Sequence, residues 1–153
     1  LYLVKPQDEV NQTYTHPSYK FAFDYPEDWA VYEQPRNFED TATVRQLLSL
    51  TLYKPHAPTD QIIGISIGLD SYQINIEPDW DLIHVAGLEA YQYKTADPTI
   101  PSQGRATLWQ RDNIRFSVIE TWPYPAEYVT NVSKSEQSAV YQQVLGSFRY
   151  LRQ

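Results

Sequence analysis

The feature that most constrains the fold is the alternation of aromatic with small or charged side chains over residues 19–25, Tyr-Lys-Phe-Ala-Phe-Asp-Tyr. Successive side chains of an extended strand point to opposite faces, so the four aromatic rings are expected to form one apolar face. Pro26 cannot donate a backbone hydrogen bond and should end this strand in a turn. The pattern therefore predicts a half-buried strand, a return arm over residues 29–32, and a buried Trp29 that closes the end of the sheet.

The C-terminal part of the chain predicts an amphipathic helix over residues 134–146. Ser133 and Glu136 have the spacing of a capping box, in which a hydroxyl and a carboxylate satisfy free N–H groups of the first turn. Gly146 is a plausible helix end because glycine is common there. The apolar side chains that recur at helical spacing, and that should pack on the sheet, are Val140, Val144, Leu145 and Phe148.

Between these two segments the chain contains several further stretches with the period-two pattern of strands. They cover residues 48–52, 62–69, 86–93, 105–111 and 114–121. Asp112 and Asn113 separate the last two, and both residue types tolerate the positive φ of a hairpin turn. Strands without helical crossovers predict an α+β fold, with an antiparallel β-sheet flanked by helices. We expect residues 1–17 to be an N-terminal tether and residues 18–153 to form a single domain.

The order of these parts resembles the PsbP-like families, which include the extrinsic photosystem II subunit PsbP and bacterial exported lipoproteins of the DcrB type. The resemblance implies an α-β-α sandwich around a twisted antiparallel sheet. It also implies an extracytoplasmic protein of the periplasm, thylakoid lumen or cell surface, held by a lipid anchor upstream. The residues that carry the resemblance are Phe21, Phe23, Tyr25, Pro26 and Trp29 near the start and Leu145, Ser147, Phe148 and Tyr150 near the end.

The charge balance argues against several classes of partner. The chain has 19 acidic and 12 basic residues and a formal charge of −7, whereas nucleic-acid backbones and anionic membranes bind clustered Lys and Arg. We therefore expect no nucleic acid, and contact with a membrane only through an upstream anchor. The chain has no Cys, which removes disulfides and thiol chemistry, and no Met, which suggests a processed piece of a longer precursor.

One segment gathers hard metal ligands, namely residues 77–84 with the sequence Glu-Pro-Asp-Trp-Asp-Leu-Ile-His. Asp79, Asp81 and His84 could hold a divalent cation, with water completing the coordination shell. The spacing matches no established calcium or zinc motif. The alternative interpretation is a solvated acidic loop that Trp80 attaches to the domain.

No other pattern indicates catalysis. The three His residues occupy loop-like contexts, and no Ser lies in a nucleophile elbow. The leading hypothesis is therefore a non-enzymatic exported accessory or binding protein that contacts a larger envelope or membrane assembly, and needs no cofactor. The alternatives are a photosystem II-associated extrinsic factor and a metal-assisted hydrolase using residues 77–84. The aromatic residues that could form a binding surface are Tyr72, Trp80, Tyr91, Tyr93, Trp109, Trp122, Tyr124 and Tyr128, with Trp122 to Pro125 as a contact loop.

Overall fold

The computed structural model describes residues 10–34, 45–55, 64–97, 102–123 and 132–152. Three strands form a small antiparallel sheet in the order β1-β2-β10. These strands are β1 (Asn11–His16), β2 (Phe21–Pro26) and β10 (Arg149–Tyr150). The small sheet thus joins the beginning of the domain to its C-terminal end.

Seven strands form a larger antiparallel sheet in the order β3-β4-β5-β9-β8-β7-β6. Hairpins connect β6 to β7, β7 to β8 and β8 to β9, while β5 pairs with β9, which is distant in sequence. The strands are β3 (Ala30–Glu33), β4 (Gln46–Tyr53), β5 (Ile65–Asp70), β6 (Asp81–Val85), β7 (Leu88–Asp97), β8 (Ser102–Arg111) and β9 (Ile114–Pro123).

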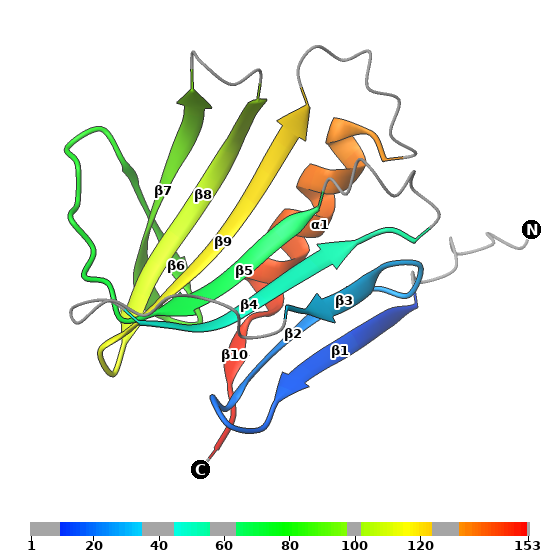
Figure 1. Ribbon diagram of the computed structural model, residues 1–153, viewed down its shortest axis with the longest axis horizontal. Helices are drawn as coiled ribbons and strands as arrows, with labels where there is room; N and C mark the ends of the chain where they lie inside the picture. The colour runs from blue at the N-terminus through cyan, green and yellow to red at the C-terminus, as the bar shows by residue number, and fades with distance from the viewer. Residues whose placement is uncertain (1–9, 35–44, 56–63, 98–101, 124–131, 153) are drawn as a thin grey trace, which may run out of the picture.

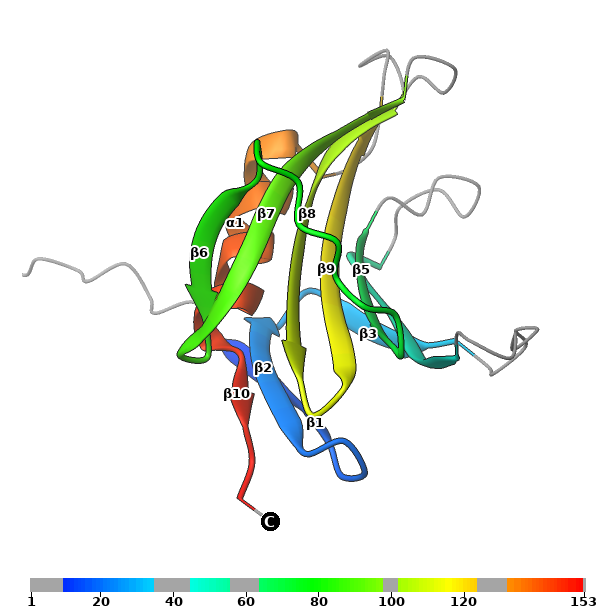
Figure 2. The ribbon, with the colours of Figure 1, turned by 90° about the vertical axis from the view of Figure 1, so that its left-hand side faces the viewer.

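Helix α1 (Lys134–Ser147) lies against one face of the larger sheet, and the small sheet lies beside it (Figures 1 and 2). Val140, Val144 and Leu145 of the helix are 3 %, 0 % and 6 % exposed, which confirms the predicted stripe. The antiparallel sheet with a covering helix is likewise confirmed. The predicted α-β-α sandwich is only partly confirmed. The described residues contain one helix, α1, and it covers one face of the sheet.

The opposite face of the larger sheet is crossed by residues 71–80, the connection from β5 to β6 (Figure 2). Near its start, the ring of Tyr72 lies under the guanidinium of Arg115 on β9, 4.8 Å from the ring centroid. At its end, Trp80 stacks on Tyr93 of β7 with the ring centroids 4.5 Å apart. Leu108, between those strands, is 5 % exposed although it points away from α1. An extended segment thus crosses this face of the sheet.

The start of α1 follows the sequence prediction, but its end does not. Ser133 accepts a 3.0 Å hydrogen bond from the N–H of Glu136, as a capping residue should. The Glu136 carboxylate accepts a 2.8 Å hydrogen bond from Lys54 on the segment after β4. Gly146 was expected to end the helix, yet the helix continues to Ser147, and extended backbone at Phe148 then leads into β10.

Two predictions about the first 33 residues are corrected. Residues 11–16 lie in β1 and not in a tether, because every one of them pairs with β2. The return arm after Pro26 does not form a hairpin with β2, since β3 pairs with β4 in the other sheet. Trp29, at the change from one sheet to the other, is 2 % exposed, which confirms its predicted burial.

The sequence predicted one of these two tight turns correctly and missed the other. Asp112 and Asn113 have φ angles of 53° and 63°, so the predicted hairpin turn between β8 and β9 is confirmed. Ala86 and Gly87, with φ angles of 52° and 79°, form the turn between β6 and β7. The sequence prediction placed Ala86 inside a strand. Alanine, unlike glycine, is disfavoured at positive φ, so its presence did not indicate a turn.

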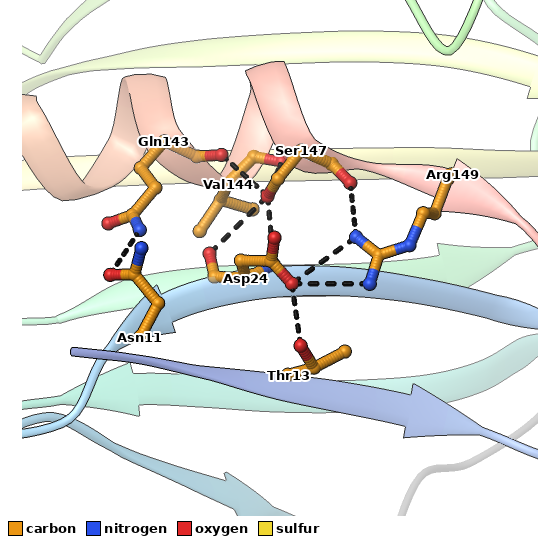
Figure 3. A network of polar contacts seen from close by, with 7 residues as sticks. All are labelled: Asn11, Thr13, Asp24, Gln143, Val144, Ser147 and Arg149. Carbon is orange, nitrogen blue, oxygen red and sulfur yellow. Dashed lines mark hydrogen bonds and ion pairs between the residues drawn. The ribbon is translucent and has the colours of Figure 1, made fainter.

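The two ends of the predicted signature meet in the core. Phe21 of β2 stacks on Phe148, with ring centroids 5.3 Å apart, and Phe148 makes an edge contact with Trp109 of β8 at 4.9 Å. Beside these rings, Asp24 accepts hydrogen bonds from Thr13 at 2.7 Å and from Arg149 at 3.2 Å (Figure 3). The residues that suggested a family therefore build the junction between β2, α1 and β10.

Candidate functional site

The structure does not bring the three predicted metal ligands together. Asp79 lies in the turn before β6, while Asp81 and His84 lie three positions apart on that strand. Residues separated by an odd number of positions on a strand point to opposite faces. Consistent with this, the described residues contain no group of three His, Asp or Glu side chains placed to hold a metal ion.

The predicted aromatic surface is divided between the outside and the interior. Tyr72 is 46 % exposed, and Trp80 and Tyr93 are half-buried in their stack on the face that α1 does not cover. Trp109 is fully buried instead, where its indole N–H donates a 2.8 Å hydrogen bond to Tyr150. Tyr124 and Tyr128 lie outside the described residues, as do Pro125 and the side chains of Trp122 and Pro123 in the proposed contact loop.

A charged pair lies beneath α1. Glu120 of β9 is 0 % exposed, and it accepts hydrogen bonds from Arg105 at 2.6 and 3.0 Å and from Ser138 of the helix at 3.0 Å. Next to it, Gln137 donates a 2.8 Å hydrogen bond to the carbonyl of Thr121. These contacts hold α1 on the sheet. Because helix and sheet enclose the carboxylate, the pair has the character of a structural contact and not of a reaction centre.

Tyr141 of α1 belongs to the same layer of polar side chains between the helix and the sheet. Its hydroxyl forms a hydrogen bond with Thr107, which also accepts one of 3.0 Å from Gln92. The guanidinium of Arg105 lies 4.6 Å from the centroid of the Tyr141 ring. Burial raises the pKa of Tyr141 above that of an ordinary phenol, so the hydroxyl stays protonated and keeps its role in the layer.

One concave surface of the described residues is a groove between α1 and the β2–β3 connection. It has a volume of about 570 Å³, within the range of roughly 300–1,000 Å³ that is typical of binding pockets. We name this surface the α1 groove. It is lined by Val10, Pro26, Glu27, Asp28, Trp29, Glu136, Ala139, Val140 and Gln143.

Apolar groups form the base and one side of the α1 groove. Trp29 and Val140 are buried at 2 % and 3 % exposure, so they form a fixed base that packing holds in place. Ala139 is exposed on the helix, and Val10, directly before β1, is 63 % exposed. The groove therefore offers apolar surface that a second molecule could cover.

The rim of the α1 groove is acidic. Three carboxylates, those of Glu27, Asp28 and Glu136, line it. Lys54 extends to this rim and lies 2.8 Å from a Glu136 oxygen and 3.4 Å from an Asp28 oxygen. The hydrogen bond with Glu136, together with the neighbouring Asp28, raises the pKa of Lys54 above its ordinary value. The rim thus stabilises a cation held between the helix and the turn.

Sequence reasoning missed this site because its parts are distant in the chain. Glu27 and Asp28 directly follow Pro26, in the turn that the sequence predicts, and Glu136 belongs to the predicted capping box. The Ser133 half of the capping box is present, whereas the Glu136 carboxylate contacts Lys54. Neither local interpretation shows that the helix start lies near the turn. No local sequence pattern indicated a role for Lys54, because its partners Asp28 and Glu136 are 26 and 82 positions away in the chain.

Comparisons with known proteins give likeness in fold only. No family model matches the chain, and no curated protein matches it in sequence. The solution structure of cyanobacterial PsbP (CyanoP) from Synechocystis sp. PCC 6803 is similar, with a TM-score of 0.51 at 10 % identity over 95 % of both chains. The chain has a PsbP-like fold.

A second similar structure is a crystal structure of a protein from Bacteroides thetaiotaomicron. It has a TM-score of 0.52 at 15 % identity and covers 92 % of this chain. The chain spans 48 % of the length of that protein. At these identities the comparisons support the fold that the signature residues predicted. Helix α1 of this PsbP-like fold, with 14 residues, lacks the length and apolar character of a membrane span.

Proposed function

We propose that this domain is a non-enzymatic, extracytoplasmic accessory protein that binds a partner protein of a larger envelope or membrane assembly through the α1 groove. The observation that carries the proposal is the groove itself. It combines a rigid apolar base, Trp29 and Val140, with polar groups around it, which is the composition of a binding site. The PsbP-like fold supports the extracytoplasmic location that we propose.

The groove also has the construction expected of a protein-docking surface. Its two walls come from different elements, the helix α1 and the β2–β3 connection, and Lys54 joins them through Asp28 and Glu136. A docking surface held by such contacts changes little when a partner binds. An extrinsic photosystem II-associated role stays a prediction, because likeness at 10 % identity concerns the fold.

The test is a photo-crosslinking residue introduced at Ala139 of the protein in its native host. Ala139 is exposed and lines the groove, so its replacement removes no buried contact. The matched control is the same residue at Gln110, which is exposed on β8 and is not part of the groove. We expect a discrete adduct with an envelope protein from position 139 and none from position 110. The same adduct from both positions, or none from 139, would contradict the proposal.

A further inference from the structure

The charges of the α1 groove favour one kind of occupant. Among the described residues that line the groove, three carry carboxylates, Glu27, Asp28 and Glu136, and the ammonium of Lys54 lies against two of them. The Asp28 side chain is 61 % exposed and that of Glu136 is 35 % exposed, so both still face solvent beside the groove. An acidic rim of this kind attracts cationic groups and repels anionic ones.

The contacts of Lys54 show how a cation is held at this place. Its ammonium lies between one carboxylate from the helix start and one from the β2–β3 turn. The remaining carboxylate of the rim, Glu27, is exposed next to Asp28. A second ammonium or guanidinium approaching from solvent would therefore meet the exposed carboxylates of Glu27 and Asp28, with which it can form charge-assisted hydrogen bonds.

Charge alone does not describe the occupant, because the groove also presents apolar surface. Val10 is 63 % exposed and Ala139 is exposed on α1, and both line the groove together with the buried Trp29. Covering such surface stabilises a complex in proportion to the apolar area removed from water. A small hydrated cation would leave this surface uncovered. A side chain with both apolar and cationic parts, or a peptide that alternates them, would cover it.

We infer that the α1 groove binds a basic segment of a partner protein in which Lys or Arg residues flank at least one large apolar side chain. This inference rests on the proposed function and adds the chemistry of the partner. The apolar side chain lies against Val10, Ala139 and the base of the groove. The cationic side chains pair with Glu27 and Asp28, while Lys54 keeps its contact with Glu136.

The experiment measures the binding of labelled synthetic peptides to the full chain by fluorescence anisotropy. Three peptides of equal length are compared: one of Lys and Leu, one of Lys and Ser, and one of Glu and Leu. We expect the Lys–Leu peptide to bind most tightly and its affinity to fall as salt is added. Equal binding of the Lys–Ser peptide would overturn the apolar part of the inference, and equal binding of the Glu–Leu peptide would overturn the basic part.

Two double variants separate the groove from the general acidity of the chain. The double variant Glu27→Gln with Asp28→Asn removes two exposed carboxylates that would form ion pairs with the peptide. The affinity for the Lys–Leu peptide should therefore fall about fivefold. The control, Asp81→Asn with Glu89→Gln, removes the same charge from exposed positions on β6 and β7. It should change the affinity by less than about twofold, because separated exposed charges are screened. Equal losses in both would overturn the inference.

A third variant tests the location from the apolar side. Ala139→Lys places a bulky cation in the groove and should abolish binding, while lysine keeps the helix intact because it is a good helix former. Unchanged binding would overturn the inference. A dimer at high protein concentration that Ala139→Lys dissociates would assign the groove to a second copy of this chain and overturn it as well. If the photo-crosslink from position 139 still forms while the peptides show no preference, the partner chemistry fails and the proposed docking function remains.

Discussion

The hydroxyl of Ser147 accepts a hydrogen bond of 2.8 Å from the backbone N–H of Asp24, a residue 123 positions earlier in the chain. The same hydroxyl lies 2.7 Å from the carbonyl of Gln143, to which it donates its proton. The last turn of α1 is thereby fixed to the middle of β2. Arg149, which follows, donates to the Asp24 carboxylate and to the Ser147 carbonyl, so the side chain and the backbone of Asp24 bind the helix end together (Figure 3).

Replacement of Ser147 by Ala should destabilise the domain by about 1–3 kcal/mol, because the N–H of Asp24 loses its partner in a half-buried position. The free energy of unfolding from urea titration measures this effect. Ser135→Ala is the matched control, since Ser135 is exposed in the first turn of the same helix. Its change should stay within about 0.5 kcal/mol. Equal changes in the two variants would show that the contact with Asp24 contributes nothing to stability.

The packing of α1 gives a second prediction. Leu145 is 6 % exposed between the helix and the sheets, and Leu145→Ala should cost about 2–5 kcal/mol through the lost burial and the cavity that remains. Gln142→Ala, at an exposed position of the same helix, is the control. The midpoint of urea unfolding checks both. An unchanged midpoint for Leu145→Ala would contradict the packing of α1 on the sheet.

Local patterns predicted those parts of the fold that depend on neighbouring residues. Period-two alternation located β4 and the strands on either side of Asp112 and Asn113, and helical spacing located α1. The pairing of β3 with β4 was missed, because no local pattern between Pro26 and Ala30 indicates which sheet the next strand joins. Strand order is decided by long-range packing, here by the burial of Trp29 where the chain changes sheets.

The helix also shows why a polar residue can mislead. Glutamine is usually exposed, and Gln137 is not part of the predicted apolar stripe of α1. It is 2 % exposed, and its amide donates to the carbonyl of Thr121 next to the buried Glu120. A helix that covers strand ends meets backbone carbonyls as well as apolar side chains, and a long amide satisfies them. The candidate groove was missed for a related reason, because its walls are far apart in sequence.

The pair beneath the helix gives a third prediction. Arg105→Met leaves the fully buried Glu120 without its guanidinium partner, and such removal of one member of a buried pair costs about 3–5 kcal/mol. The double variant Arg105→Met with Glu120→Gln should recover part of this loss, because a neutral amide costs less to bury than a carboxylate. Thermal and urea unfolding of the single and double variants provide the comparison. A double variant less stable than the single variant would contradict this account.

The last prediction concerns His16 at the end of β1. Its Nδ1 accepts a 3.2 Å hydrogen bond from the N–H of Tyr19, and its ring stacks on Phe21 with centroids 5.7 Å apart. Burial lowers the pKa of His16 below its ordinary value of 6.5, although the nearby Glu33 acts in the opposite direction. Both the accepted hydrogen bond and the ring contacts favour the neutral imidazole.

The sign of the pH effect follows from this direction. Above the ordinary pKa of 6.5 the imidazole is neutral in both states, and it adds no pH dependence. As the pH falls below that value, the unfolded chain binds a proton before the folded chain does, so the stability decreases. His16→Asn keeps a hydrogen-bond acceptor near Nδ1 but does not titrate. We therefore expect it to flatten the loss of stability between about pH 7 and about pH 5, a range above that in which ordinary carboxylates titrate.

The matched control is His84→Asn, since His84 is exposed on β6 at the edge of the larger sheet, whereas His16 lies on β1 of the small sheet. Unfolding free energies are measured by urea titration across this pH range for the parent chain and both variants. His84→Asn should retain the slope of the parent chain, and His16→Asn should lose most of it. A slope that survives in His16→Asn, or disappears in His84→Asn, would show that the imidazole at the end of β1 is not the group whose protonation destabilises the fold.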